Sequence, residues 1–130
     1  MAAMAFREPN QVKWMGIRPG HNGTQVVALN TATNAEVLLY TVTAGKTLFL
    51  VSASVGWTGG GSGWGIIMIQ TAASADWYYP CFTSGSSNYF ASQGNFNPCV
   101  PLEVPAGYKC YVKSVGATFR VHGSIFGWEE

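Results

Sequence analysis

Acidic side chains are the first candidates for chemistry in this 130-residue chain, because paired carboxylates perform general acid and base catalysis. Asp76 and Glu103 could meet in a folded chain, but no spacing in the sequence brings them together. A single Asp also makes a dedicated calcium site unexpected. We therefore interpret the acids as solvated groups at strand edges and predict no catalytic residues: Glu8, Glu36, Asp76, Glu103, Glu129 and Glu130.

The two histidines lack the convergent spacing of a metal site. His21 lies in a Pro-Gly-His-Asn-Gly turn, and His122 lies near Arg120 on the polar face of the last expected strand. We predict that both are surface residues and that the chain holds no metal. His122 with Arg120 could bind an anion or an acidic partner.

The three cysteines form no C-x-x-C pair, which argues against zinc and thioredoxin-like chemistry. An odd count is typical of reduced thiols that pack as small apolar groups. Cys110 falls on the apolar face of its expected strand, whereas Cys81 and Cys99 flank a polar stretch that a disulfide between them could bridge. We predict no cofactor.

A run of aromatic residues beside amides is the last candidate site. Ring faces and amide groups together can hold a sugar, and the same mixture suits a protein interface or a packed core. These three alternatives stay open for the candidate glycan or partner surface, which consists of Trp57, Trp64, Trp77, Tyr89, Asn88 and Asn95.

Composition excludes several classes of protein. Only 10% of residues are charged, against about 25% in ordinary soluble domains. A formal net charge of +1 argues against nucleic-acid binding, and five Trp, six Tyr and seven Phe argue against disorder. No apolar run approaches the ~18 residues of a membrane span, and the first ten residues do not resemble a secretion signal.

The elements that must position these residues are strands. No window has helical periodicity, and short apolar stretches alternate with turn residues about every ten positions, which is typical of an all-β sandwich or barrel. We expect an antiparallel β-sandwich domain over 25–130, with a long polar loop at 83–97. The expected strands are 25–30, 36–43, 46–57, 63–72, 76–82, 98–104, 108–115 and 117–127.

The last two expected strands alternate between an apolar and a polar face. Cys110 and Val112 share the apolar face of one strand, and Phe119 and Val121 share that of the other.

Three central segments are apolar on both faces: 36–42, 48–51 and 66–69. A two-layer sandwich covers one face of each sheet, so the second face needs a long loop or a neighbouring subunit over it. We favour a homo-oligomer, with subunit contacts at Leu39, Phe49, Ile67 and Ile69.

One turn phrase occurs twice. The segment 42–50 matches 104–112 in its Val-x-Ala-Gly turn and in the strand that follows. Gly45 and Gly107 are expected to supply the positive φ of a tight turn. The repeat favours a jelly roll, a sandwich of two related halves, although similar hairpins also choose similar residues.

Residues 1–24 stand apart as an extended N-terminal arm or linker. Pro, Gly and Asn interrupt any periodicity, while several large apolar residues remain. The segment could be a loose terminus, a strand on its own domain, or an arm that docks on a larger assembly. The docking residues would be Val12, Trp14, Met15 and Ile17.

Residues 36–130 resemble a known family. Leu39–Ser54 (LYTVTAGKTLFLVSAS) is similar to a Tyr-x-Val-Pro-Ala-Gly-Lys-Thr opening in small virion structural proteins of tailed bacteriophages. The Val104-Pro-Ala-Gly turn and the ending Gly-x-x-Phe-Gly-Trp-Glu-Glu are similar as well. Thr43 stands where that family often has Pro, and residues 1–24 match no known pattern.

The resemblance implies a non-enzymatic capsid decoration protein or head or tail fibre subunit. It implies a jelly-roll domain, a homotrimer, and a major capsid or other virion protein as partner. The expected location is the virion surface, after synthesis in the host cytoplasm without a signal peptide. The alternative is a carbohydrate- or receptor-binding module at a fibre tip, with a host surface glycan as ligand.

Overall fold

A computed structural model describes residues 23–59, 61–86 and 93–130. Within these ranges the chain is all-β and forms two antiparallel sheets, which confirms the all-β, antiparallel part of the predicted fold. The same residues contain no helix capable of crossing a membrane. The strands are β1 (Thr24–Thr33), β2 (Glu36–Thr41), β3 (Leu48–Gly59), β4 (Gly63–Gln70), β5 (Asp76–Gly85), β6 (Gln93–Phe96), β7 (Leu102–Val104), β8 (Lys109–Val115) and β9 (Arg120–Glu129).

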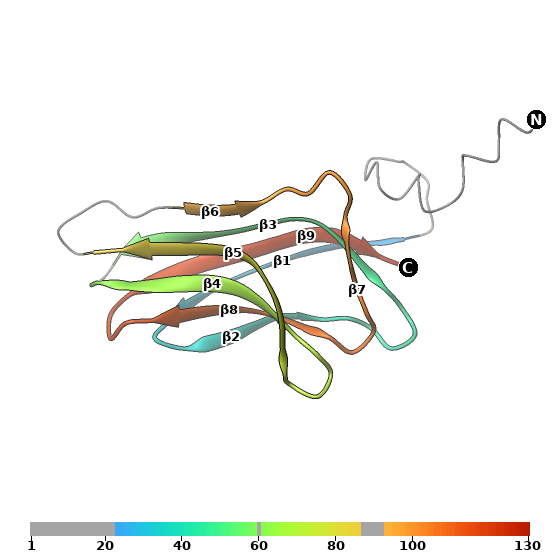
Figure 1. Cartoon of the computed structure of the whole chain (residues 1–130), viewed down its shortest axis with the longest axis horizontal. Coiled ribbons are helices and arrows are strands. Elements are labelled where there is room, and N and C mark those ends of the chain that lie inside the picture. The colour runs from blue at the N-terminus through green and yellow to red at the C-terminus, as the bar shows by residue number, and fades with distance from the viewer. Residues whose placement is uncertain (1–22, 60, 87–92) are drawn as a thin grey trace, which may run out of the picture.

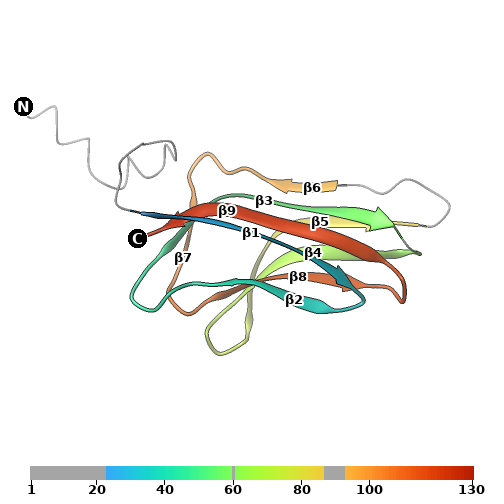
Figure 2. The same ribbon diagram turned by 180° about the vertical axis from the view of Figure 1, so that it is seen from behind.

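The two sheets lie face to face as the layers of a sandwich (Figures 1 and 2). Sheet A has the order β1-β9-β3-β6, with β7 also paired to β3, and sheet B has the order β2-β8-β4-β5. The pairs are nested along the chain: β4 pairs with β5, β3 with β6 and β7, β2 with β8, and β1 with β9.

The core lies between the sheets, and strand alternation fills it. Cys110 and Val112 of β8 and Val121 of β9 are completely buried, as is Phe119 just before β9. Their neighbours along the chain face outward, so the two-face pattern predicted for these segments is confirmed. Fully burying one such side chain contributes about 1.5–3 kcal/mol.

The two matching turn phrases lie side by side. Val42 N–H donates to the Tyr108 carbonyl at 2.9 Å, and Gly107 N–H donates to the Val42 carbonyl at 3.0 Å. Gly45 and Gly107 have φ values of +77° and +81°, which confirms that they supply the left-handed turn positions.

The sheets also meet along one side, where β6 lies against β5. Gly94 of β6 lies on the backbone of Phe82, and a Cβ at Gly94 would overlap the Phe82 carbonyl oxygen. Only glycine allows the two backbones to approach this closely.

The predicted loop at 83–97 was wrong at both ends. Strand β5 continues to Gly85 and β6 occupies Gln93–Phe96, because backbone pairing with β4 and β3 holds these polar residues in extended form. The expected strand 98–104 is reduced to Leu102–Val104. Short polar strands with one exposed face lack the apolar run that identifies a strand from sequence.

Candidate functional site

The outer face of sheet B carries a group of large apolar side chains. The register places Leu38, Tyr111 and Met68 in one row across β2, β8 and β4. A second row contains Ile66 and Phe82, with Trp64 next to them. We call the set the sheet B patch: Leu38, Trp64, Ile66, Met68, Phe82 and Tyr111.

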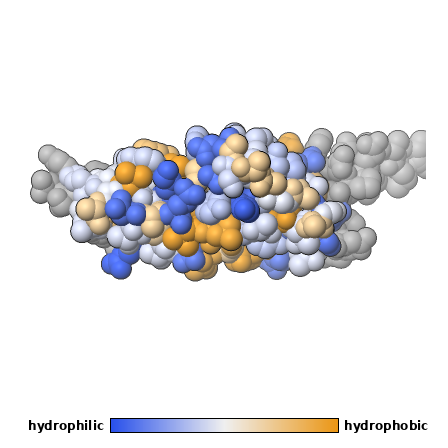
Figure 3. Space-filling view, turned by 90° about the horizontal axis from the view of Figure 1, so that it is seen from below, coloured by the Kyte–Doolittle hydropathy of each residue, from blue (hydrophilic) through white to orange (hydrophobic). Residues whose placement is uncertain are grey.

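The centre of the sheet B patch is covered and its margins are open. Ile66 and Met68 are only 9% and 1% exposed. Leu38 and Phe82 remain 46% and 54% exposed on β2 and β5, the two edge strands of the sheet. Seen from below, the molecule has a hydrophobic area between hydrophilic groups (Figure 3).

Charge at the sheet B patch is sparse and balanced. The Lys113 ammonium lies 3.9 Å from the Glu36 carboxylate, and both side chains are more than a third exposed. Such an exposed pair contributes little stability, about 0–1 kcal/mol. Asp76 and Lys109 lie on the same face, because Gln70 bonds to the Asp76 carboxylate, contacts Met68 and pairs with Lys109, so charges of both signs border the apolar side chains.

The structure corrects the residues predicted for subunit contacts. Ile67 and Ile69 point into the core and are fully buried, and Leu39 packs against that core. Strand β4 is indeed apolar on both faces, but its outward residues are Ile66 and Met68. The period-two alternation was predicted correctly, but Ile67 and Ile69 were assigned to the outer face in place of Ile66 and Met68.

Phe49 does face outward from sheet A, but it is only 3% exposed. Its ring stacks on Trp128 with centroids 5.6 Å apart. Phe49 and Trp128 are both buried within the single chain and therefore present no open surface.

A row of aromatic rings runs from β6 past β5 to the residue just before β8. Tyr78 meets Phe96 edge to face at 6.1 Å, and Trp77 meets Tyr108 in the same manner at 5.1 Å. Trp77 and Tyr78 lie 6.1 Å apart and are 40% and 42% exposed. We call these four residues the aromatic row; each exposed ring is held by a partner ring.

Two register irregularities in β5 explain this exposure. The pairing of β4 with β5 shifts between Ile67 and Ile69 and again between Ile69 and Gln70. The residues Asp76–Tyr79 are consequently all exposed, where a regular strand would bury every second one.

Asp76 forms a small polar cluster at the start of β5. Its carboxylate accepts hydrogen bonds from Tyr79 Oη at 2.6 Å and from Gln70 Nε2 at 3.0 Å. The bond from Tyr79, followed by that from Gln70, lowers the pKa of Asp76, and the same bond raises the pKa of Tyr79. The cluster is solvent-exposed and holds the carboxylate of the residue before Trp77 in place.

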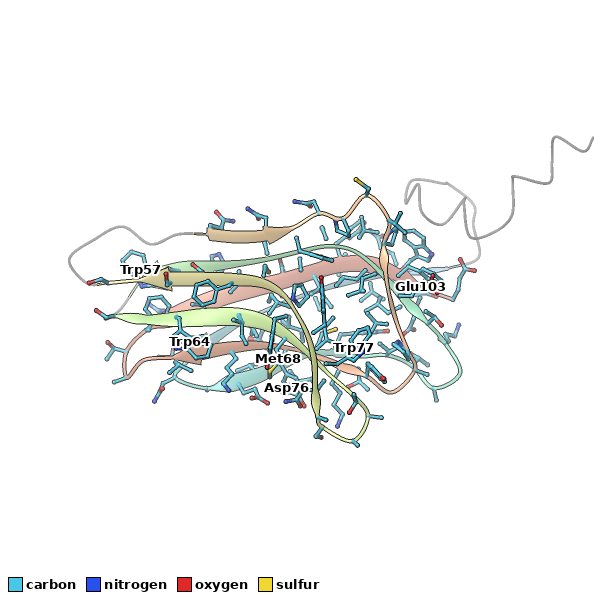
Figure 4. All side chains as sticks on the ribbon, viewed as in Figure 1. Trp57, Trp64, Met68, Asp76, Trp77 and Glu103 are labelled. Atoms are coloured by element: carbon cyan, nitrogen blue, oxygen red, sulfur yellow. The ribbon has the colours of Figure 1, made fainter. Side chains whose placement is uncertain are left out.

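The tryptophans predicted to form one glycan surface do not converge. Trp57, Trp64 and Trp77 come from β3, β4 and β5; Trp57 and Trp64 lie near one end of the molecule, and Trp77 lies toward the other (Figure 4). Trp57 stacks on the core residue Phe119 at 6.2 Å, and its Nε1 has no partner among the described residues.

Trp64 stacks instead on Phe82 at 6.3 Å, within the sheet B patch. Asn95 is exposed on β6, opposite Ser54. Asn88 and Tyr89 lie outside the described residues, as do the arm residues Val12, Trp14, Met15 and Ile17.

The acids do not gather into a catalytic pair in the described part of the chain. Asp76 belongs to sheet B and Glu103 to β7 of sheet A, and the two side chains lie well apart (Figure 4). Among residues 23–59, 61–86 and 93–130, no group of three His, Cys, Asp or Glu could hold a metal ion.

Glu129 differs from the other acids of the described residues, because it is only 4% exposed. Its carboxylate accepts a 2.7 Å hydrogen bond from the Thr43 backbone N–H. Burial alone would raise the pKa of Glu129, but hydrogen bonds from Thr43 and Tyr40 outweigh it, so the pKa is lowered. This carboxylate fastens the turn after β2 to the end of β9 and has a structural role.

The thiols are unpaired in the structure. Cys81 and Cys110 are buried, and burial raises the pKa of each to about 12. Cys99 is exposed, so the bridge considered between Cys81 and Cys99 is not formed.

Sequence reasoning missed the exposed residue Phe82, and it left Tyr78 and Tyr79 out of the six-residue candidate surface although both belong to the same aromatic run. The signal was present in part: three consecutive aromatic residues at 77–79 cannot all face a core in a regular strand. Neither bulge of β5 was identified, so the side on which these rings lie was not predictable from alternation.

No protein-family model matches the sequence, and the curated proteins contain no match to it.

Proposed function

We propose that this chain is a non-enzymatic structural subunit of a tailed-bacteriophage particle, a capsid decoration or fibre-type protein that associates with copies of itself. The observation that carries the proposal is the sheet B patch. Leu38 and Phe82 are 46% and 54% exposed beside buried Ile66 and Met68, which is the composition of an interface centre with a polar rim.

The strand order supports the jelly-roll part of this proposal. Four nested pairs along the chain are what results when one long hairpin is rolled into two facing sheets. Jelly rolls of this kind are common in viral capsid proteins and lectins. That distribution agrees with both the leading function and its alternative.

Energetics favour covering the sheet B patch. Fully burying a Leu or Phe side chain contributes about 1.5–3 kcal/mol relative to exposing it. Leu38 and Phe82 have about half of that gain still unrealised in the single chain. The nearby charges Lys113 and Glu36 have opposite signs, so a second copy can approach without net repulsion. We propose a homotrimer, as in the family that the chain resembles.

Docking on the particle would use residues 1–24 as an arm. The proposed contacts are Val12, Trp14, Met15 and Ile17, which are large apolar residues in a segment that also carries Arg7, Glu8, Lys13 and Arg18. An arm that binds only the assembled shell adds contacts that must break before the shell opens, and so stabilises the shell by linkage.

Particle binding tests this function. Purified protein is mixed with particles that lack it, and bound protein is quantified by mass spectrometry after sedimentation. We expect saturable binding in regular stoichiometry, weakened at least about tenfold by Trp14→Ala with Ile17→Ala. Val100→Ala, at an exposed apolar residue of the loop before β7, is the matched control. Absence of binding to any such particle contradicts the proposal.

The alternative function is glycan binding, and the aromatic row favours it. Trp77 and Tyr78 present exposed rings fixed by Tyr108 and Phe96, and Asp76, the residue before Trp77, carries a carboxylate held by Tyr79. Fixed ring faces next to a hydrogen-bond acceptor suit the apolar face and the hydroxyls of a pyranose.

A glycan array with Trp77→Ala separates the two functions, and Trp64→Ala serves as the control on a different surface. If the protein does not bind particles, and binds a glycan that only Trp77→Ala abolishes, the alternative function replaces the leading one. The original set containing Trp57 is not proposed again, because Trp57 packs on the core.

A further inference from the structure

The two sheets have four edges in the described part of the chain: β1 and β6 with β7 in sheet A, and β2 and β5 in sheet B. An edge strand offers unpaired backbone N–H and C=O groups to any other extended chain. Proteins usually protect such edges by short length, bulges, charges or proline.

Three of the four edges are protected in these ways. Strand β2 has six residues, a bulge between Leu38 and Tyr40, and the charge of Glu36. Strand β5 has two register shifts and contains Pro80. Strands β6 and β7 have only four and three residues, and Gly94 of β6 lies against β5.

Strand β1 has none of these protections. It is ten residues long (TQVVALNTAT), contains no charge and no proline, and pairs with β9 without a register shift from Thr24 to Thr33. No described strand pairs with its other side.

The backbone direction along β1 can be assigned from Thr31. Its N–H donates to the side chain of Asn30 at 2.8 Å, so this N–H points away from β9. In an antiparallel ladder the groups of alternate residues point to the same side. The N–H and C=O groups of Val27 and Leu29 therefore face the open edge.

The side chains of the same residues are the most exposed large apolar groups of the described chain. Leu29 is 73% exposed and Val27 is 61% exposed, and Phe126 lies opposite Val27 on β9 with 37% exposure. Open backbone groups and open apolar side chains thus coincide at one place.

We propose that β1 pairs antiparallel with β1 of a second copy of this chain, joining two A sheets edge to edge. A second copy is the occupant that the structure favours, because β1 is the only unprotected edge of the described residues and an uncharged strand meets itself without repulsion. A two-fold axis at Ala28 sets Val27 opposite the partner subunit's Leu29, so an apolar pair forms on each side of the axis.

This contact is independent of the sheet B patch. It lies on the other sheet, and a two-fold contact closes after two copies. The two proposals therefore predict different assemblies when each surface is disabled separately.

Four full-length proteins test the inference by sedimentation velocity: the parent chain, Leu29→Pro, Phe82→Lys, and the double variant. Proline at 29 removes only an N–H that β9 does not use, so the β1–β9 ladder is kept. We expect dimers for Phe82→Lys, and an association constant lower by at least about tenfold once Leu29→Pro is added. Leu29→Ala, which keeps the N–H, is expected to weaken pairing less.

Amide hydrogen exchange measured by NMR gives a second readout. In the Phe82→Lys protein the Val27 and Leu29 amides should exchange more slowly as concentration rises, while the exposed Lys46 amide of the β2–β3 turn should not change. Should Leu29→Pro fail to fold, Val27→Lys places a charge on the strand with the backbone unchanged and is expected to abolish pairing.

Three results would overturn the inference. The first is a Phe82→Lys protein that stays monomeric. The second is an association constant that neither β1 variant changes. The third is an exchange rate of the Val27 and Leu29 amides that does not depend on protein concentration. None of these results tests the sheet B patch. Self-association through that patch is tested with the Leu29→Pro single variant, in which β1 pairing is weakened.

Discussion

The Glu129 carboxylate accepts a 2.7 Å hydrogen bond from the backbone N–H of Thr43, a residue 86 positions earlier in the chain. This bond joins the end of β9 to the turn between β2 and β3. The backbone groups of Thr47 and Glu130 exchange hydrogen bonds of 2.9 and 3.1 Å beside it. The C-terminal residues are therefore an integral part of the sandwich.

Stability should fall in acid because of Glu129. The folded-state pKa of this carboxyl lies below its usual value of 4.5, so its stabilising contribution is complete above pH 4.5 and disappears as pH falls through the folded pKa. We expect Glu129→Gln to reduce the free energy of unfolding by about 1–3 kcal/mol at pH 7, and the deficit to shrink in acid. Urea unfolding between pH 3 and 7 measures this, with the exposed Glu103→Gln as control. Equal pH dependence of parent and Glu129→Gln would contradict the assignment.

Gly94 should tolerate no side chain. A Cβ there would overlap the Phe82 carbonyl oxygen and lie 2.7 Å from its backbone nitrogen, so β5 and β6 would have to separate. We expect Gly94→Ala to cost about 1–3 kcal/mol, measured by thermal unfolding. Gly56→Ala, whose Cβ would meet nothing closer than 3.6 Å, is the control. A Gly94→Ala protein as stable as Gly56→Ala would show that the two strands are not in close contact.

One thiol of three should react readily. Cys99 is exposed, whereas Cys81 and Cys110 are buried with pKa values raised to about 12. Thiolate is the reactive form, so an aromatic disulfide reagent at pH 8 should modify Cys99 rapidly and the other two only after denaturation. Cys99→Ser should remove the fast phase completely. A fast phase that survives this substitution is the opposing result.

Substitutions at core residues and at surface residues of sheet B should affect different properties, namely chain stability and self-association. Ile67→Ala removes a fully buried side chain and is expected to cost about 2–5 kcal/mol without changing the contacts between subunits. Leu38→Ala, at a 46% exposed residue, should change chain stability by less than about 0.5 kcal/mol but weaken self-association. Urea unfolding and sedimentation on the same samples measure both effects. The reverse pattern would restore Ile67 as a subunit contact.

Alternation and turn chemistry were sufficient to predict much of the fold. Cys110, Val112, Phe119 and Val121 follow period two and were assigned to the buried face correctly. Gly45 also adopts the positive φ that its turn phrase predicts. These are local properties, which depend on neighbouring residues in the chain.

Long-range pairing was not predictable in the same way. Strand β6 is recognised only through its partner β3, since its residues Gln93–Phe96 are mostly polar. The choice between Ile66 and Ile67 as the outward residue depends on where strand β4 lies between the sheets. Sequence defines two faces of a strand, but tertiary contacts decide which one is buried.

For the candidate sites as well, the local features were predictable from the sequence and the long-range arrangement was not. Exposed Phe82 and Leu38 lie in segments recognised as strands, yet their positions on the two edge strands of sheet B, with Ile66 and Met68 between them, follow from the order β2-β8-β4-β5. The three tryptophans close in sequence were grouped by composition. Trp57 lies in sheet A, and Trp64 pairs with Ser84 at the opposite end of β5 from Trp77.

Self-association through the sheet B patch is the central proposal, and sedimentation velocity on the Leu29→Pro protein tests it most directly. At about 100 μM, where a micromolar interface is filled, we expect a discrete oligomer that Phe82→Lys converts to monomer and that Val100→Lys leaves intact. A Leu29→Pro protein that is monomeric at this concentration, or an oligomer that Phe82→Lys does not weaken, would contradict the account.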